Sequence, residues 1–181
     1  MSKRGAGLVL KDFNLLVTTA RGNEEDAASE IWYLLGEIGD RAAKVDKTGI
    51  SGLIAAMTDL ESFEVVGKFR AILKERPYEF RYTLRVIPVE KVVRTELGEI
   101  QRTVNDLNSK IDEKETFRVT VEKRFNSTPT RDIIEATAAK IDRKVDLSHP
   151  NKIVLIEVVG GLTGVSILKP DDILSILKER M

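Results

Sequence analysis

The order in which two hydrophobic periodicities follow each other is the feature that most limits the fold of this chain. In the first half of the chain, short apolar or alternating runs typical of strands come first, third, fourth and sixth, and amphipathic helical spacing comes second and fifth. The expected elements lie at residues 13–19, 24–38, 42–46, 52–58, 62–76 and 80–89. This βαββαβ order predicts a ferredoxin-like domain over residues 8–90, in which two helices cover one face of an antiparallel sheet.

The first expected helix shows the basis of these predictions. Asn23 is a favourable N-cap residue, and the acidic residues that follow it suit the positive end of the helix dipole. Ile31 and Leu35 belong to an apolar stripe with three- and four-residue spacing, and Gly39 ends the pattern. Trp32 lies at helical spacing beside Leu35, so we expect its indole in the hydrophobic core.

The remaining residues, 91–181, predict a second domain of mixed helices and strands that packs against the first. The expected elements are a helix at 95–111, a strand at 116–125, a helix at 130–141, strands at 153–159 and 165–168, and a last helix at 171–180. A run of sequence Gly-Gly-Leu-Thr-Gly, residues 160–164, separates the last two strands. We interpret this run as a hairpin turn that uses positive φ angles, and not as a ligand-binding loop.

The composition excludes several classes of protein. No apolar run approaches the ~20 residues of a membrane-spanning helix, and no long apolar region follows the basic start to form a secretory signal. We therefore expect a cytoplasmic protein with no membrane partner. The chain has no cysteine, which excludes disulfides, thiolate catalysis and the usual zinc sites. Its basic and acidic residues number 29 each, so net charge alone does not point to nucleic acid.

Motifs that accompany RNA-modifying catalysis are also missing from the sequence. There is no Gly-x-Gly-x-x-Gly run after a strand, no phosphate-binding Gly-x-x-x-x-Gly-Lys-Ser/Thr loop, and no Pro-Cys-x-x-Cys motif for zinc deamination. The single histidine, His149, lies in a polar loop segment, where we expect a surface residue and not a base or a metal ligand. These observations predict a protein that is not an enzyme and holds no cofactor or metal.

The junction at residues 122–131, where an expected strand leads into an expected helix, is the strongest candidate for a binding site. Within residues 114–131, five basic residues stand against two acidic ones. A helix N-terminus offers unpaired N–H groups and a partial positive charge, so phosphate can bind there, with Ser127 or Thr128 bonding a ribose or phosphate oxygen. The alternative is an ordinary cap, in which Thr128 caps the helix and Pro129 takes its first position.

Other residues near this junction and elsewhere are weaker candidates. Phe125 either stacks on a base or closes the core beneath the start of the helix. Arg85, Arg94, Asn151 and Lys152 either follow the backbone of an RNA or are ordinary solvated side chains.

Taken in order, the segments of the second domain resemble a THUMP domain. The residues that carry the resemblance are Phe117-Arg118-Val119-Thr120-Val121-Glu122-Lys123-Arg124, Ser127-Thr128-Pro129-Thr130-Arg131-Asp132-Ile133-Ile134, Lys144-Val145-Asp146-Leu147 with Pro150, residues 153–159, and Gly164-Val165-Ser166-Ile167. Residues 13–24 look like the opening of the small THUMP proteins related to the adaptor for tRNA cytidine acetylation, so the resemblance covers nearly the whole chain. The chain departs from the common pattern in carrying Asn126, instead of arginine, before Ser127.

This resemblance implies a function. THUMP domains bind tRNA and grip its acceptor end, including the 3′ tail, and they usually accompany a catalytic domain. By resemblance, this chain is a non-catalytic tRNA-binding adaptor that presents tRNA to a separate acetyltransferase that makes N4-acetylcytidine. We expect a monomer, because each of the two predicted domains has its own helices and strands. The alternative is a structural or interaction protein of an RNA-processing assembly that does not bind RNA directly. The residues expected to contact RNA are Arg85, Arg94, Lys123, Arg124, Phe125, Ser127, Thr128, Thr130, Arg131, Asn151 and Lys152.

Overall fold

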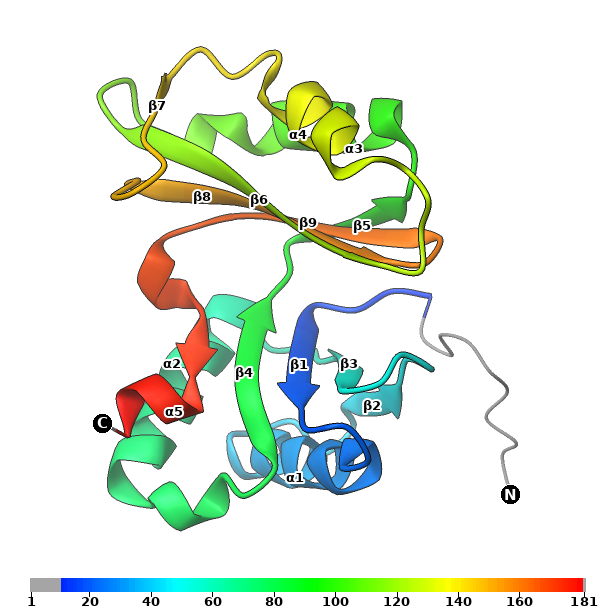
Figure 1. The fold of residues 1–181 in the computed structure, drawn as a ribbon. Coiled ribbons are helices and arrows are strands. Elements are labelled where there is room, and N and C mark those ends of the chain that lie inside the picture. The colour runs from blue at the N-terminus through cyan, green and yellow to red at the C-terminus, as the bar shows by residue number, and fades with distance from the viewer. Residues whose placement is uncertain (1–10, 181) are drawn as a thin grey trace. The chain divides into compact units, whose positions relative to one another are not determined.

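The computed structural model describes residues 11–180, which form two compact units (Figure 1). Of the described residues, unit 1 comprises 11–88 and 172–180, and unit 2 comprises Val89–Asp171. Residues 172–181 belong to the second domain in the prediction from the sequence, whereas the described part of this segment lies in unit 1. Over residues 11–180, no helix is both long enough and apolar enough to span a membrane.

Unit 1 is built on a five-stranded sheet with the order β10-β4-β1-β3-β2, in which all neighbouring strands are antiparallel. Its elements are β1 (Leu15–Thr19), α1 (Glu24–Glu37), β2 (Lys44–Lys47), β3 (Leu53–Met57), α2 (Ser62–Glu75), the 3-10 helix η1 (Pro77–Glu79), β4 (Thr83–Pro88), β10 (Leu174–Ser175) and α5 (Ile176–Glu179). The order β4-β1-β3-β2 is that of the split βαββαβ arrangement, so the predicted antiparallel fold of this region is confirmed.

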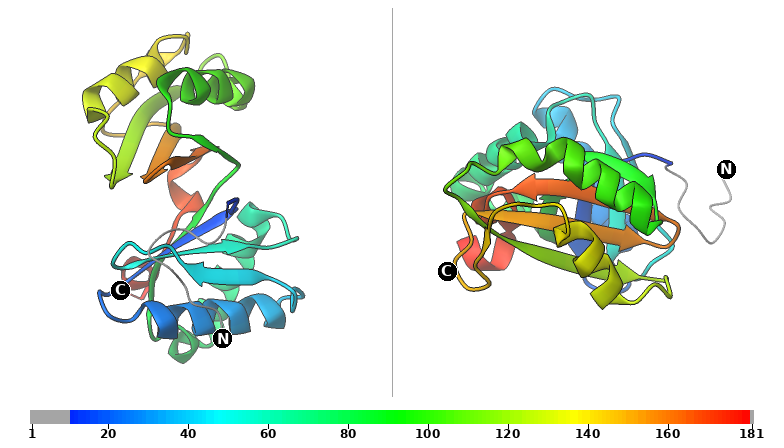
Figure 2. Two further views of the ribbon diagram at one scale, coloured as in Figure 1. Left: turned by 90° about the vertical axis from the view of Figure 1, so that its right-hand side faces the viewer. Right: turned by 90° about the horizontal axis from the view of Figure 1, so that it is seen from above.

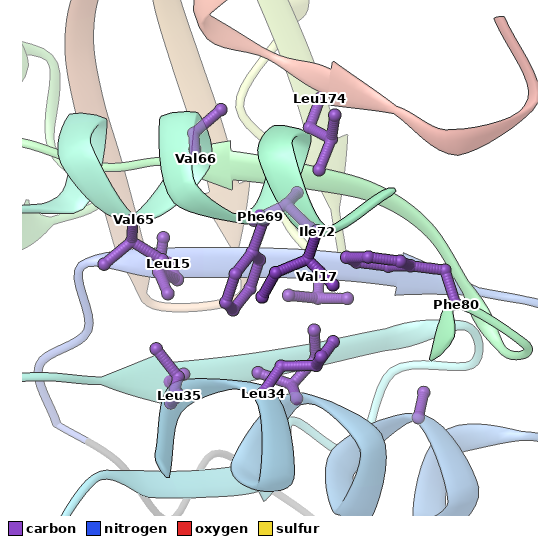
Figure 3. Packing of buried hydrophobic residues seen from close by; sticks show 14 of the residues in the cluster. Leu15, Val17, Leu34, Leu35, Val65, Val66, Phe69, Ile72, Phe80 and Leu174 are labelled. Atoms are coloured by element: carbon purple, nitrogen blue, oxygen red, sulfur yellow. The ribbon is translucent and has the colours of Figure 1, made fainter. Parts of the chain in front are cut away.

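One hydrophobic cluster joins both long helices of unit 1 to a single face of its sheet. Leu15 and Val17 are two positions apart on β1, so their side chains point to the same face. There they meet Leu34 of α1 and Phe69 of α2 (Figure 3). The ring of Phe69 lies edge-on to Phe80, with 6.1 Å between the ring centroids. Because α1 and α2 bury their apolar stripes in the same cluster, both helices cover the same face.

The C-terminal segment completes this sheet, and the predicted helix at 171–180 is wrong. Leu174 on β10 lies opposite Val86 on β4, and its side chain is buried beside α2 (Figure 3). The short helix α5 begins directly after β10, and its first residue, Ile176, is also buried. A strand is favoured at Leu174–Ser175 because it pairs the backbone groups along the free edge of β4 and directs Leu174 inward.

The prediction that Trp32 lies in the core is also wrong. Trp32 is 53% exposed and the adjacent Tyr33 is 51% exposed. Helix α1 buries a stripe that includes Ile31 and Leu35. Successive helical residues are about 100° apart around the axis, so Trp32 and Tyr33 lie on the outer side of the helix.

Unit 2 contains a second five-stranded sheet, with the order β5-β9-β8-β6-β7, and Figure 2 shows α3 and α4 lying over its strands. Its elements are β5 (Lys91–Arg94), α3 (Leu97–Leu107), the 3-10 helix η2 (Asn108–Lys110), β6 (Thr116–Arg124), α4 (Thr130–Ala138), β7 (Lys144–Val145), β8 (Lys152–Val159), β9 (Leu162–Leu168) and the 3-10 helix η3 (Pro170–Asp172). Strand β6 runs parallel to β7 and β8, whereas β9 runs antiparallel to β5 and β8. The short strands β5 and β7 were not predicted.

The core of unit 2 follows from the two periodicities of its elements. Val154, Ile156 and Val158 occupy alternate positions on β8 and belong to one buried cluster. The same cluster contains Ile100 from α3 and Ile133 from α4. Both helices therefore cover one face of the sheet, and their N-termini are placed by the ends of the strands that precede them.

Candidate nucleic-acid interface

The predicted junction lies at one end of the sheet of unit 2, where the ends of four strands meet. Strands β6 and β8 are parallel, so both terminate at this end of the sheet, and β9 starts there after the turn at Gly160. Strand β5 pairs antiparallel with β9 and terminates at the same end, with Arg94 opposite Leu162. We call the region formed by residues 94–97, 123–131 and 160–161 the basic end of unit 2.

The glycine turn holds the basic end together. Gly160 has a φ of 60°, which confirms the predicted hairpin with a positive φ angle. Its N–H donates to the carbonyl oxygen of Arg124 at 2.8 Å. Its carbonyl oxygen accepts hydrogen bonds from the Thr95 hydroxyl at 3.1 Å and from the Asn126 side-chain amide at 3.0 Å. This turn therefore fixes the ends of β5 and β6 relative to each other.

Phe125 is presented to solvent by an unusual backbone conformation. Its φ is 51°, in the left-handed region that is unfavourable for residues other than glycine, and its side chain is 79% exposed. The following residue, Asn126, holds this conformation because its Oδ1 accepts the N–H of Thr128 at 2.9 Å while its amide binds Gly160. The alternative in which Phe125 closes the core is wrong.

Helix α4 begins without a side-chain cap. Pro129 is the N-cap residue, no side chain bonds to the first turn, and the N–H groups of Asp132 and Ile133 both donate to the Pro129 carbonyl oxygen. The alternative of an ordinary cap, with Thr128 as the capping residue and Pro129 at the first helical position, is therefore wrong. Among residues 11–180, the N–H groups of Thr130 and Arg131 have no acceptor, so these donors and the positive end of the helix dipole are available to an anion.

Helix α3 starts at the same end of the sheet as α4, and this proximity of the two helix starts was not predicted from the sequence. Its N-cap residue, Glu96, makes no side-chain cap, and Ile100 is the first residue whose N–H bonds back to the Glu96 carbonyl oxygen. Thr95 attaches this start to the glycine turn, since its N–H donates to the Gly161 carbonyl oxygen at 2.9 Å. The pattern Lys-Val-Val-Arg of β5 was the available signal, because a β-branched pair between charges is typical of a short strand.

Two predicted RNA contacts, Lys123 and Arg124, use their charged groups inside the unit. Arg124 Nη1 lies 2.6 Å from Oε1 of Glu157, a carboxylate on β8 that is 1% exposed. A buried carboxylate is costly without a partner, so this ion pair keeps the ends of β6 and β8 intact. Lys123 Nζ donates to the Thr128 carbonyl oxygen at 2.8 Å and closes the loop before α4.

Two arginines at the basic end remain accessible. The side chain of Arg94 is 73% exposed and that of Arg131 is 87% exposed. Each has only a solvent-exposed carboxylate beside it, Glu96 at 3.8 Å and Glu135 at 3.1 Å, and such pairs are weak. Ser127 and Thr130 are exposed as well, and Thr128 is half-buried.

The structure separates the other predicted contacts from this group. Lys152 lies opposite Phe117 at the start of β6, seven register positions from the pair Arg124 and Val159. At 3.3 Å per residue this is roughly 23 Å from the basic end. Lys152 Nζ binds the Glu115 carboxylate at 2.8 Å, and this hydrogen bond lowers the pKa of Glu115.

The remaining two candidates, Asn151 and Arg85, also lie outside the basic end. Asn151 Oδ1 accepts the N–H of Thr116 at 2.8 Å, at the same far end of the sheet as Lys152. Arg85 lies on β4 of unit 1, opposite Ser175 of β10, and is half-buried.

His149 is a surface loop residue, as predicted. It is exposed, and its N–H and that of Ser148 donate to Oδ1 of Asp146 at 3.0 and 3.1 Å, which lowers the pKa of the Asp146 carboxyl. Within the described part of the chain, no three histidine or acidic residues converge in an arrangement that could hold a metal ion.

Comparisons with known proteins identify the domain that carries the basic end. A family model described as the THUMP domain matches residues 94–168. No curated protein sequence matches the chain.

Three solved structures share the fold. PH1313 from Pyrococcus horikoshii Ot3 is 16% identical with a TM-score of 0.64, and the similarity covers 87% of this chain and 55% of that one. TrmN from Thermus thermophilus is 19% identical with a TM-score of 0.58, over 86% of this chain and 45% of that one. A predicted N6-adenine-specific DNA methylase from Listeria monocytogenes str. 4b F2365 is 18% identical with a TM-score of 0.52, over 86% and 40%. This chain therefore spans about half the length of these proteins, and the likeness concerns the fold.

The family match and the geometry concern the same residues. The matched range begins at Arg94, includes the loop and the uncapped start of α4, and ends at Leu168, the last residue of β9. The chain is thus an α+β protein in which an antiparallel sheet region is combined with a THUMP domain at residues 94–168, a module associated with tRNA binding in tRNA-modifying enzymes.

Proposed function

We propose that the chain binds the acceptor end of tRNA at the basic end of unit 2 and acts as a non-catalytic adaptor for a separate tRNA cytidine N4-acetyltransferase. The observation that carries the proposal is the convergence, within a THUMP domain, of two helix N-termini without side-chain caps, two accessible arginines and one exposed aromatic ring.

Each of these groups has a role in the proposed interface. The free N–H groups at the starts of α3 and α4, together with Arg94 and Arg131, bind backbone phosphates. Phe125 stacks on a base, and such stacking requires a base that is not already in a duplex. A single-stranded 3′ tail beside a helical stem supplies both features, so the acceptor end is the part of tRNA that suits this surface.

The structure changes which residues should be tested. Lys123 and Arg124 hold the loop and the sheet, so reversing their charges would disturb the fold as well as any RNA contact. Arg94→Glu with Arg131→Glu changes only accessible side chains. A matched control is Lys114→Glu with Lys140→Glu, which alters two exposed lysines that lie outside the basic end.

The test is a titration of the purified chain against intact tRNA and against tRNA without its 3′ tail, at 50 and 200 mM salt. We expect affinity to fall with salt, to fall on removal of the tail, and to fall roughly tenfold in the Arg94→Glu/Arg131→Glu variant, with the salt slope reduced by about two. The lysine control should stay near the wild-type value. Equal affinity of all three proteins for both RNAs would reject the basic end as the site.

The adaptor role has its own measurement. The isolated chain should transfer no acetyl group from an acetyl donor to tRNA, and its addition should raise the rate at which a tRNA cytidine acetyltransferase modifies tRNA. Wild-type protein that binds no tRNA at low salt would favour an assembly protein without direct RNA contact. Acetylation by the chain alone would overturn the non-catalytic assignment.

A further inference from the structure

The outer side of α1 in unit 1 is a second surface with the features of an interface. Trp32 and Tyr33 are adjacent and about half exposed, which is uncommon for large aromatic side chains on a solvated helix. Trp32 borders two hollows of about 400 and 530 Å³. We call Trp32, Tyr33 and the residues that line these hollows the α1 aromatic face.

The first hollow lies between α1 and β2 and is predominantly acidic. It is lined by Trp32, Glu25, Asp26 and Ser29 with Ala28 from α1, and by Val45, Asp46 and Lys47 from β2. Three carboxylates thus face one ammonium group. Asp46 is buried and its Oδ1 accepts the N–H of Lys47 at 2.8 Å, so Glu25 and Asp26 are the carboxylates that a ligand would meet.

The charge of the whole helix supports this description. Helix α1 has no basic residue, and its acidic residues are Glu24, Glu25, Asp26, Glu30 and Glu37. The second hollow is lined by Trp32, Tyr33, Gly36, Glu37 and Arg41. There the carboxylates of Glu37 and Glu79 raise the pKa of the Tyr33 hydroxyl.

Some of these carboxylates accept hydrogen bonds from backbone N–H groups of unit 1, whereas others are available to a ligand. Glu24 accepts the N–H groups of Gly22 and Gly52, and Glu30 accepts those of Arg81 and Thr83. Glu25 is 84% exposed and has only Lys47 at 3.4 Å. Among residues 11–180, the exposed carboxylate of Asp26 has no hydrogen-bond or ion-pair partner. Two accessible carboxylates therefore lie about two helical turns before an accessible indole and line the same hollow.

We propose that the α1 aromatic face docks a basic segment of a protein partner, with an arginine side chain packed on Trp32 and its guanidinium paired with Glu25 and Asp26. Guanidinium groups stack on indole rings and bind carboxylates, so this single side chain satisfies both features of the first hollow. Nucleic acid is excluded as the occupant because these carboxylates repel phosphate. The inference is independent of tRNA binding at the basic end.

Trp32 is the single tryptophan of the chain, so its fluorescence changes when a ligand binds beside it. The probe is a fluorescently labelled octa-arginine peptide, followed by anisotropy and by quenching of the Trp32 emission, with octa-lysine as a comparison of equal charge. We expect octa-arginine to bind more tightly than octa-lysine, because arginine is the better partner for an aromatic ring. Equal binding of the two peptides without quenching would place them elsewhere and overturn the proposal.

Matched variants distinguish binding at the α1 aromatic face from non-specific attraction of the peptide to other acidic residues. We expect affinity for octa-arginine to fall about fivefold in Trp32→Ala and about fivefold in Glu25→Gln/Asp26→Asn. The control Asp106→Asn/Glu113→Gln removes two exposed carboxylates from unit 2 and should change affinity less than twofold. An equal loss in the control would show non-specific attraction and reject the site.

A parallel titration with intact tRNA keeps this test apart from the proposed function. Trp32→Ala should bind tRNA with wild-type affinity even if the Arg94→Glu/Arg131→Glu variant does not. A loss of tRNA affinity in Trp32→Ala would make the α1 aromatic face an RNA surface and overturn the assignment to a protein partner.

Discussion

Trp32 and Phe125 are both large aromatic residues that face solvent, and their surroundings have opposite charge. Trp32 lies in the middle of a regular helix, 53% exposed, beside the carboxylates of Glu25 and Asp26. Phe125 is 79% exposed on a left-handed residue, near Arg94 and Arg131 at the basic end. Exposure of an aromatic ring therefore does not by itself identify a partner, and the charges around the ring indicate which kind of partner would fit it.

On both surfaces, some of the charged side chains are already bonded to other groups of the protein, and a count of charges does not show this. At the basic end, Arg124 is committed to Glu157 and Lys123 to the loop before α4. On α1, Glu24 and Glu30 are committed to backbone N–H groups of neighbouring loops. Only the remaining charges are available to a partner, so substitutions at committed and at free charges should have different effects.

The largest expected effect is on stability, at the committed charge of the basic end. Arg124→Met should lower the free energy of unfolding by roughly 3–5 kcal/mol, because it leaves the Glu157 carboxylate buried without its cation. Denaturant unfolding followed by far-ultraviolet circular dichroism measures this loss, and Arg124→Met/Glu157→Met should recover much of it. The exposed Arg131→Met should cost less than about 0.5 kcal/mol. Equal stability of Arg124→Met and Arg131→Met would show that the buried ion pair has no structural role.

The next effect separates RNA binding from stability at Phe125. Phe125→Ala and Phe125→Gly both remove the ring, so each should weaken tRNA binding by roughly 1–3 kcal/mol in a titration. The glycine variant should be more stable than the alanine variant by about 1 kcal/mol in thermal unfolding, because glycine adopts the positive φ without strain. Unchanged tRNA affinity in both variants would remove Phe125 from the interface.

The smallest effect is expected on the other side of the comparison. Trp32→Ala should change the free energy of unfolding by less than about 1 kcal/mol, since an exposed side chain leaves no cavity. Phe69→Ala, which leaves a cavity in the core of unit 1, should lower the free energy of unfolding by about 3–5 kcal/mol in the same denaturation experiment. A loss at Trp32 as large as that at Phe69 would mean that the indole is part of the core and not of an interface.

Most of the secondary structure was predictable because it depends on local patterns. The strands at β1, β3, β6 and β8 and the helices α1, α2 and α4 agree with the expected ranges to within a few residues. The errors have a common cause. Leu174–Ser175 is a strand because β4 offered a free edge, and β5 and β7 are strands of four and two residues that exist through pairing with β9 and β6. Pairing between distant segments leaves little trace in a short sequence window.

The sequence by itself determined the order of the longer elements, the antiparallel architecture of unit 1 and the position of the basic junction before α4, because periodicity, turns and local charge are properties of neighbouring residues. Only the tertiary structure decided which charges and rings are available. Arg94, Arg124 and Gly160 are distant in sequence and are brought to the same end of the sheet by the register of four strands. That register pairs Arg124 with Glu157 and leaves Arg94 exposed to solvent. Exposure and pairing are set by contacts between elements, so they emerge only when the sheets are assembled.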